Sequence, residues 1–431
     1  YDYRLEGSIR SELFAGKDPS TGIPTFKSLF TELALQTHLH PVPEVKAYAE
    51  TRFRFGREYE EPLQEIILRE AYIHWDTHPF SFRLGKQIPV LGNTSFIQPV
   101  DILSPVHTLV RSSSEDDRRL GNWMVRGTFT PGNRSSLDLY WIPLPRSSVL
   151  MTRIFDYPGE VILLPTPPPA MEWRNSSAGL HYLFRGSALD FGITAFYGYH
   201  HWPGLAIEAL RLDSLTGTLS ELHLVEKRYR ISSVGAYLTL PLGNSVVRLE
   251  SAWKQALSKA GEQSHIPYPE VSYSTEWELS GTHLSWVMGY YGKAILEDDL
   301  PDVDAGMLTG STSLSSALPV ELPPGFSPMD WADRQVRGLN MLVNYQAEPW
   351  YHAVYTILVA DLLHQTLSLE LPVMYNAVAK ELTLYPSATL RVSDGFTAIV
   401  GASLLTGEEG SLYHLAAPYL NAGYVSFRVT F

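Results

Sequence analysis

Cysteine is absent from the whole chain of 431 residues. Disulfides, zinc–thiolate sites, thiol nucleophiles and haem attachment through cysteine are therefore excluded. The absence also favours a secreted envelope protein, in which free thiols could mispair.

Long apolar runs are missing as well. Stretches such as Val161–Pro165 and Tyr355–Ala360 are far shorter than the roughly 18 apolar residues of a transmembrane helix. Charged residues make up only 18%, below the roughly 25% of an ordinary soluble domain. The net charge of −13 argues against a nucleic-acid partner. The chain begins at Tyr1 without methionine, and we expect that a signal peptide has been removed.

Motifs of common enzyme sites are not found either. The sequence has no Gly-x-Ser-x-Gly elbow, no His-Glu-x-x-His and no phosphate-binding loop, and its histidines are scattered. We therefore expect no enzyme activity, no cofactor and no metal. A Ser–His pair assembled in space, as in an outer-membrane phospholipase, stays open as an alternative.

Period-2 alternation over about ten residues is the main positive signal, and it repeats along the chain. In the first segment, Leu5, Ile9 and Leu13 alternate with Arg10 and Glu12. A sheet with one apolar face and one charged face fits a barrel with lipid outside and water inside. Closure is required because only a barrel satisfies all backbone groups of a sheet in hydrocarbon. We predict one all-β domain over residues 1–431, a transmembrane antiparallel β-barrel of about 18 strands, with 16 as the alternative.

The connections alternate between short turns and long loops, as in outer-membrane barrels with short periplasmic turns and long extracellular loops. The doubt about strand number lies in residues 350–393, where Leu362–Leu371 could extend one strand or form another. A break in phase at Ser232-Ser233 predicts a β-bulge. The predicted short turns are Pro41–Pro43, Thr77–Pro79, Pro131–Asn133, Arg185–Ser187, Gly243-Asn244, Ser280-Gly281, Ala347–Pro349 and Asp394-Gly395.

The last residues alternate again, with Gly423, Val425, Phe427, Val429 and Phe431 on one face. This segment resembles the terminal β-signal of bacterial outer-membrane proteins. The resemblance implies that the barrel-assembly machinery is a partner and recognises Phe431. It also implies an outer membrane of the Gram-negative type, with membrane lipid and lipopolysaccharide as surroundings.

A further resemblance covers residues 68–105. Leu68–Tyr72 is followed by Arg83–Gln87 and then by Gly92, Pro99, Asp101 and Pro105. This order is similar to the strand-plus-loop signature of porin-like barrels and, in part, of alginate-export-like barrels. Leu91 departs from that signature, because those barrels often have Trp there. The resemblance implies passage of a polar or anionic substrate.

The loop at residues 89–116 contains several prolines, which restrict its backbone. We expect it to fold into the lumen and narrow the pore; an outward surface loop is the alternative.

Charges on the polar strand faces are the candidates for lining the pore, because rings of charge set selectivity in channels. The candidates are Arg4, Glu6, Arg10, Glu12, Glu32, Glu50, Arg52, Arg54, Arg83, Gln87, Asp101, Arg126, Arg228, Arg230, Arg248, Glu250, Glu276 and Glu278. Arginine slightly outnumbers acid, and guanidinium suits carboxylate and phosphate.

Three functions fit such a lumen. The first is a channel or transporter for small polar, and by the arginine excess anionic, solutes. The second is an exporter conduit for a polysaccharide or lipid-like substrate that works with periplasmic partners. The third is a structural sheath around a partner such as a multihaem cytochrome.

Overall fold

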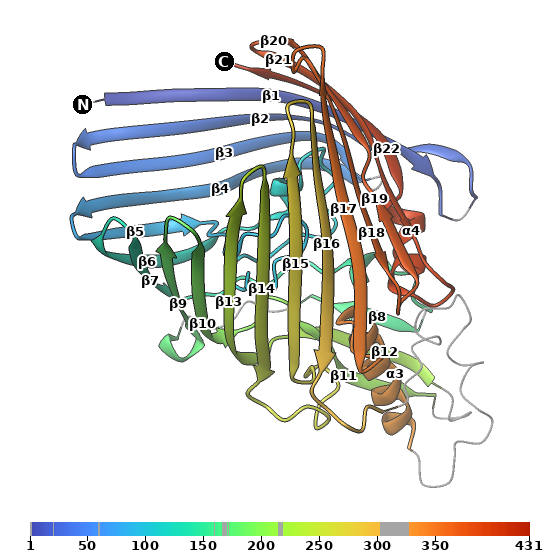
Figure 1. The fold of residues 1–431 in the computed structure, drawn as a ribbon. Coiled ribbons are helices and arrows are strands. Elements are labelled where there is room, and N and C mark those ends of the chain that lie inside the picture. Colours follow the sequence, from blue (N-terminus) through green and yellow to red (C-terminus); the bar gives the residue numbers. More distant parts are fainter. Residues whose placement is uncertain are drawn as a thin grey trace.

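The structure, a computed structural model, describes residues 2–19, 21–58, 61–158, 160–165, 170, 172–213, 219–301 and 327–431. Its main feature is a closed antiparallel barrel of 18 strands (Figure 1). The ring closes where the first strand pairs with the last. The predicted all-β barrel of about 18 strands is confirmed, and the alternative of 16 strands is wrong.

The barrel is built from these strands: β1 (Asp2–Lys17), β2 (Pro24–Val42), β3 (Val45–Glu58), β4 (Glu61–Thr77), β5 (Phe80–Gln87), β6 (Asn122–Gly132), β7 (Ser135–Ile142), β9 (Ser177–Arg185), β10 (Asp190–Tyr199), β13 (Arg230–Leu242), β14 (Ser245–Ala256), β15 (Glu270–Ser280), β16 (Leu284–Ile295), β17 (Trp350–Leu362), β18 (Leu367–Asn376), β19 (Glu381–Leu384), β20 (Ser387–Ser393), β21 (Phe396–Thr406) and β22 (Ala422–Thr430).

The region of doubtful strand number contains β17 and β18, which are separate strands joined by a turn at residues 363–366. β19 and β20 are two pieces of one barrel strand, because both pair with β18 and with β21. The interruption falls at Tyr385-Pro386, where proline supplies no backbone N–H to the ladder.

The bulge predicted at Ser232-Ser233 is wrong, since β13 pairs without a register shift through both residues. A bulge occurs instead in β4, where Arg69 is the extra residue opposite the Glu50–Thr51 step of β3. A bulge changes the direction of the side chain relative to the regular alternation, so the alternation does not predict the direction of Arg69.

Short turns gather at one end of the barrel, together with both termini, and the long connections gather at the other end (Figure 1). Of the predicted short turns, Ala347–Pro349 is wrong, because it ends the long connection between β16 and β17. Pro349 is a residue type typical of turns, but here it lies directly before β17 at the loop end of the barrel.

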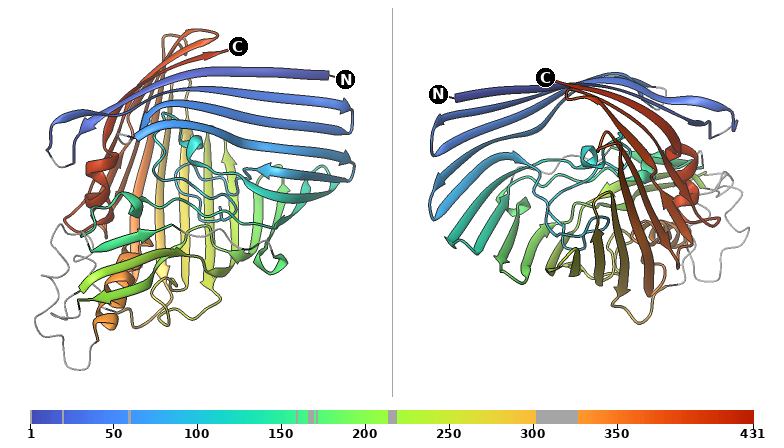
Figure 2. Two further views of the ribbon diagram at one scale, coloured as in Figure 1. Left: turned by 180° about the vertical axis from the view of Figure 1, so that it is seen from behind. Right: turned by 45° about the horizontal axis from the view of Figure 1, so that its top comes forward.

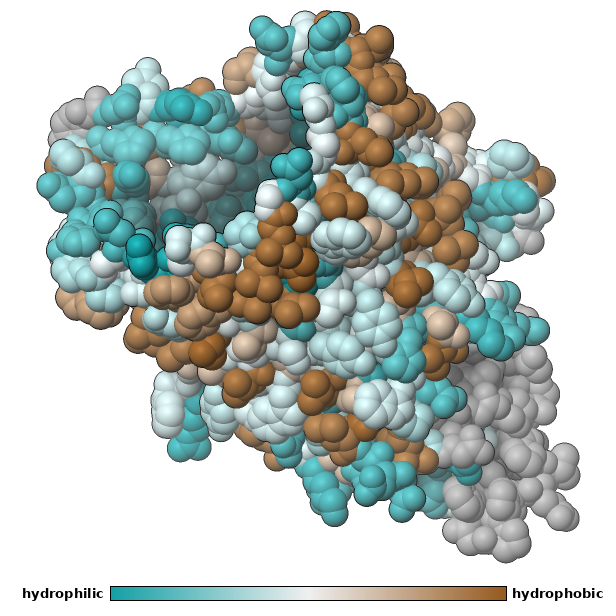
Figure 3. All heavy atoms as spheres, viewed as in Figure 1, coloured by the Kyte–Doolittle hydropathy of each residue, from teal (hydrophilic) through white to brown (hydrophobic). Residues whose placement is uncertain are grey.

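The two faces of the wall differ as the alternation predicts. On β14 and β15, Leu249 and Trp277 are 38% and 46% exposed, whereas Glu250 and Glu276 are buried. Figure 3 shows hydrophobic side chains over the outer surface of the strands and hydrophilic residues around a hollow at the turn end. The apolar face is therefore outside and the charged face inside, which suits a lipid environment.

An outer cap lies at the loop end of the barrel. It consists of a small sheet, β8 (Val161–Leu164), β11 (Gly204–Leu212) and β12 (Leu219–Lys227), and of helices α3 (Pro328–Val343) and α4 (Leu412–Leu420). Leu222 and Leu224 pack there against Trp331 and Val336 in a buried apolar cluster. Short 3-10 helices, η1 (Glu115–Arg118), η2 (Met151–Ile154) and η3 (Trp173–Asn175), complete the connections.

Local chemistry explains the start of α3. Ser327 and Asp330 form a capping box, and Pro328 takes the first helical position, where no N–H is needed. Within the described residues, no helix has the length and apolarity needed to cross a membrane.

Candidate functional site

The long connection between β5 and β6, residues 88–121, lies inside the ring of strands (Figure 2). Its side chains and backbone contact β14, β15 and β17 on one side and β1 and β3 on the other. Because those strands are well separated around the barrel, only a segment that crosses the lumen can reach both. The predicted inward fold of this loop is confirmed, and we call residues 88–121 the lumen loop.

On the first side, two carboxylates hold the tip of the lumen loop. Glu250 accepts hydrogen bonds from the backbone N–H groups of Asn93 and Thr94, the second at 2.7 Å. Glu276 accepts from the backbone and hydroxyl of Ser95, the hydroxyl at 2.8 Å. Hydrogen bonds to charged groups contribute about 1.5–3 kcal/mol each, so this side is firmly attached.

An aromatic contact supports the same tip. The ring of Phe96 lies 5.3 Å from that of Tyr355, whose hydroxyl donates to Glu276 at 3.1 Å. Tyr355 in turn covers Gly289 on the neighbouring strand, where an added Cβ would come within 2.0 Å of the ring. A glycine at this position therefore makes room for the tyrosine that supports the loop.

On the opposite side, Asp117 of the lumen loop bridges two arginines of the wall. It lies 2.6 Å from Arg10 on β1 and 2.6 Å from Arg52 on β3. Arg10 and Arg54 also pair with Glu32, at 2.9 and 2.6 Å. The wall and the loop thus share one ion-pair network.

Further members complete this network. Glu50 pairs with Arg52 at 2.7 Å, and Glu12 accepts a hydrogen bond from Ser113 of the lumen loop. Burial by itself would raise the pKa of Asp117, but Arg10 and Arg52 outweigh it and hold that pKa below its usual range. The carboxylate that fixes the loop is consequently ionised throughout the physiological range.

A cavity of about 510 Å³ lies between the lumen loop and strands β2–β5. Six cationic side chains line it against four carboxylates, and we call it the arginine cavity. Its charged residues are Arg52, Arg54, Arg69, Lys86, Arg119 and Arg146 with Glu32, Glu58, Glu65 and Asp117. The excess of guanidinium groups suits carboxylate or phosphate groups of a solute.

Two of these cations are placed by local backbone features. Arg69 is the bulge residue of β4, and its guanidinium donates to the backbone oxygen of Asp116 in the lumen loop at 2.9 Å. Arg146 lies in the connection after β7, and its backbone N–H donates to the side chain of Asn122 at 2.8 Å. Neither position belongs to a regular alternating strand.

His107 also lines the arginine cavity. Burial, together with the nearby cations Arg146, Arg153 and Arg54, lowers the pKa of its imidazole to about 4. The ring is therefore neutral between pH 5 and 8, so that it does not add to the positive charge there.

The remaining pore-lining candidates fall into three groups. Arg83, Arg126, Arg248 and Glu278 lie on the inner face: Arg83 covers the ring of Tyr72, Arg126 pairs with Asp138 at 2.8 Å, and Arg248 pairs with Glu278 at 2.6 Å. Arg4 and Glu6 line a hollow of about 810 Å³ at the turn end, together with Phe431. The other four candidates are placed differently from the prediction.

Arg230 lies on the outer face of β13. Its neighbour Ile231 points inward, and its guanidinium covers Tyr197, which is 53% exposed. Arg228 lies before β13 and donates to the backbone oxygen of Pro145 at the loop end. The predicted inward direction of Arg228 and Arg230 is therefore wrong. The predicted alternation runs across residues 228–229, but β13 begins only at Arg230.

Gln87 and Asp101 have supporting positions. The buried amide of Gln87 donates to the backbone oxygen of Met124 at 3.1 Å. Asp101 pairs with Arg119 within the lumen loop at 2.5 Å, and burial raises the pKa of its carboxyl. These two side chains shape the loop and its attachment to the wall.

Sequence reasoning missed several residues of the site, including Arg69, Lys86, Asp117, Arg119 and Arg146. Lys86 has the phase of the outward residues Phe82 and Leu84 on β5, so alternation would have placed it outside; it lines the cavity only because β5 ends at Gln87. Asp117 and Arg119 had no signal, because a loop has no period that predicts a direction. In the described part of the chain, no group of three or more His, Asp or Glu side chains is placed to hold a metal ion.

Comparison with solved structures identifies the architecture. The crystal structure of OccAB3 from Acinetobacter baumannii matches with a TM-score of 0.56 at 10% identity, covering 100% of this chain and 99% of that one. OccK2 (OpdF) from Pseudomonas aeruginosa, solved in complex with glucuronate, matches with a TM-score of 0.56 at 10% identity, covering 100% and 97%. The outer membrane protein OpdK from the same organism matches with 0.54 at 7% identity, covering 100% and 98%.

The chain has the fold of these porin-like barrels. At such low identity the likeness concerns the fold alone. No family model and no curated protein matches the sequence. The predicted likeness to porin-like barrels is confirmed at the level of fold, while a specific likeness to alginate-export-like barrels is not shown.

Proposed function

We propose that this protein is an outer-membrane channel that passes small polar solutes and prefers anions. The observation that carries the proposal is the arginine cavity, in which six cations face four carboxylates beside a loop that narrows the lumen. Fixed charges at a narrow point set selectivity because a solute sheds part of its hydration there. The barrel is oriented with its short turns toward the periplasm and the outer cap outside.

The fold of the solved barrels supports a channel rather than an enzyme. One of them, OccK2, was solved with glucuronate, which is a small carboxylate. The match of fold does not by itself assign that solute to this chain. The anion preference therefore depends on the charges of this lumen and needs its own test.

The two alternative functions fit the lumen less well. A sheath would need a wide interior, but the lumen loop is attached to opposite walls and occupies that space. A polymer conduit would need a continuous groove, whereas the arginine cavity holds about 510 Å³, the size of a small-molecule site. We also propose that the barrel contacts lipopolysaccharide, that the barrel-assembly machinery recognises Phe431, and that a periplasmic partner can bind.

Reversal potentials in planar bilayers test the anion preference. Under a KCl gradient we expect the wild type to favour chloride, and Arg146→Gln to reduce that preference by roughly a factor of two because it removes one of six cations. Arg211→Gln is the matched control, since Arg211 is 65% exposed in the outer cap and pairs with Glu221. Purified protein without conductance would refute the channel; equal chloride and potassium permeability would refute the anion preference.

A further inference from the structure

Two cavities on the other side of the lumen loop have a chemistry unlike that of the arginine cavity. We propose that they form a second lane through the barrel, which passes uncharged ring compounds rich in hydroxyl groups, of the monosaccharide class. This inference rests on the proposed channel function, and it adds a separate route and a second class of solute.

The lumen loop divides the space next to the wall. On one side of it lies the arginine cavity, against β2–β5; on the other side lies a cavity of about 230 Å³ against β18–β22, which we call the tyrosine cavity. Val110 lines both cavities. Two contacts attach the loop to β1: Arg10 pairs with Asp117, and Glu12 accepts a hydrogen bond from Ser113. β1 lies between these two sets of strands.

The tyrosine cavity continues toward the loop end. It shares Met151 and Tyr413 with an outer cavity of about 290 Å³, which lies between the ends of β13–β16, α3 and α4. In the other direction the tyrosine cavity reaches Glu370 and Ser387. These two residues lie opposite each other on the paired strands β18 and β20, toward the turn end of β18. The two cavities together therefore extend from the outer cap into the inner half of the barrel.

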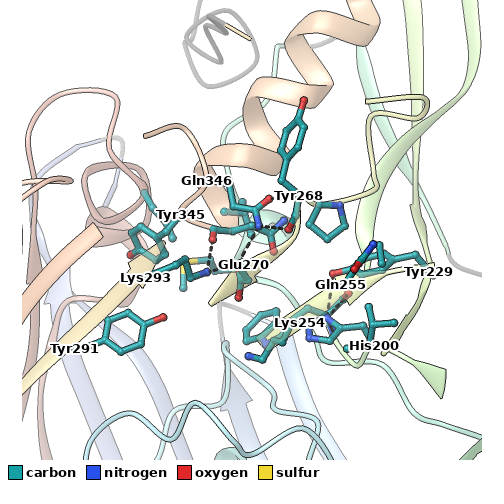
Figure 4. A pocket seen from close by; sticks show the side chains of 18 of the residues that line it. His200, Tyr229, Lys254, Gln255, Tyr268, Glu270, Tyr291, Lys293, Tyr345 and Gln346 are labelled. Atoms are coloured by element: carbon teal, nitrogen blue, oxygen red, sulfur yellow. Dashed lines mark hydrogen bonds and ion pairs between the residues drawn. The ribbon is translucent and has the colours of Figure 1, made fainter. Parts of the chain in front are cut away.

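Tyrosine distinguishes this lane from the arginine cavity. Among the residues that the structure describes, seven tyrosines line the outer and tyrosine cavities, and none lines the arginine cavity. Tyr268 and Tyr291 lie in the outer cavity (Figure 4), and Tyr385 and Tyr424 line the tyrosine cavity. A tyrosine offers a ring face to the C–H groups of a sugar and a hydroxyl that both donates and accepts.

Charges in the lane are mostly compensated within the protein. In the outer cavity Glu270 pairs with Lys293 at 2.9 Å and accepts from Gln346 at 2.9 Å, as Figure 4 shows. In the tyrosine cavity Arg118 pairs with Glu115 at 3.2 Å. Paired charges present hydrogen-bonding groups to a solute with little net attraction for an anion, whereas six cations and four carboxylates line the arginine cavity.

The absence of native cysteine permits a direct test. Ser387→Cys places one thiol in the tyrosine cavity, and Ile67→Cys places one in the arginine cavity, where Ile67 lies opposite Arg52 on β3. Each variant is reconstituted in liposomes and then labelled with a bulky uncharged methanethiosulfonate reagent. Labelling after folding keeps the barrel assembled, and a reducing agent should restore transport.

Uptake of glucose and of glucuronate is measured before and after labelling, because the two share a ring and differ by a carboxylate. We expect the label at position 387 to reduce glucose uptake by at least about fivefold and to leave glucuronate uptake nearly unchanged, with the reverse at position 67. A label that reduces both solutes equally at either position would overturn the second lane. So would a thiol at position 387 that the reagent cannot reach.

Failure of the channel itself has a different signature. In that case neither solute enters liposomes that contain the unlabelled variants faster than it enters protein-free liposomes. That result refutes the proposed function and the lane together, whereas transport without separation of the two solutes refutes the lane alone.

Discussion

At the scale of the residue, Asp117 connects the lumen loop to two neighbouring regions of the wall. Its carboxylate lies within 2.6 Å of both Arg10 and Arg52, and all three side chains are largely buried. Removing one member of a buried ion pair costs about 3–5 kcal/mol, because the remaining charge loses its partner. Asp117 is therefore the main ionic attachment of the loop to β1 and β3, beside the hydrogen bond of Ser113 to Glu12.

Asp117→Asn should loosen the loop next to the arginine cavity. The expected result is noisier single-channel current together with a stronger preference for chloride, since a carboxylate is lost from the cavity lining. Asp116→Asn is the matched control, because Asp116 is exposed and this substitution changes the charge by the same amount. Equal effects of both substitutions would contradict a specific role for Asp117.

The same residue gives a prediction for pH. The folded-state pKa of Asp117 is lowered, so its contribution to stability is complete above the unfolded pKa of about 3.9 and is lost as pH falls below that value. His107, with a pKa of about 4, is likewise already neutral at pH 5. We expect the current noise of the wild type to be constant from pH 8 to pH 5; a rise within that window would show that another group holds the loop.

At the scale of the element, the lumen loop is held by carboxylates that belong to strands far from its own ends. Glu250 on β14 and Glu276 on β15 together accept from the backbone of Asn93, Thr94 and Ser95. A strand supplies rigid positions at a fixed spacing, and the loop supplies the N–H groups. The width of the lumen therefore depends on pairing between β14 and β15 as much as on the loop itself.

The double variant Glu250→Gln and Glu276→Gln should release the tip of the loop. An amide keeps an acceptor but loses the charge and brings an N–H group toward N–H donors, so the tip should move and the single-channel conductance should rise. Glu278→Gln is the control on the same strand, because the contacts of Glu278 are with Arg248 and Ser280 of the wall. Conductance that is unchanged in the double variant would show that Phe96 and Asp117 suffice to hold the loop.

At the scale of the whole molecule, the barrel closes through the last residue. The backbone groups of Phe431 and Gly7 exchange two hydrogen bonds of 2.9 Å, and the Phe431 ring occupies the space beside that glycine. Closure satisfies the edge strands β1 and β22, which would otherwise expose unpaired backbone groups. The terminal aromatic thus has a structural role next to its proposed role in assembly.

Phe431→Ser should separate these roles, because it leaves the closing backbone hydrogen bonds in place. In cells we expect several-fold less folded barrel in the outer-membrane fraction, while refolding in detergent proceeds as in the wild type. Phe427→Ser on the same strand is the control, since Phe427 is also exposed on the outer face. Equal losses for both variants in cells would argue against specific recognition of Phe431.

Local sequence patterns are sufficient to predict the class of fold and the direction of most wall residues. Alternation of Leu249 with Glu250 and of Trp277 with Glu276 has a period of two because successive side chains of a strand point to opposite faces, and this relation is local. Turn residues such as Gly243-Asn244 mark strand ends for an equally local reason. Where the local pattern was misleading, as at Arg230 and at Ala347–Pro349, the cause was a strand boundary that the pattern does not define.

The contents of the lumen, by contrast, depend on contacts between distant parts of the chain. Whether Asp117 meets Arg10 and Arg52, or Ser95 meets Glu276, depends on closure of the ring, which brings residues separated by long stretches of chain together. The bulge at Arg69 and the outer cap of α3, α4, β8, β11 and β12 depend on packing for the same reason. The sequence therefore gave a charged inner face, and closure of the barrel around the lumen loop turned it into an arginine cavity on one side and tyrosine-lined cavities on the other.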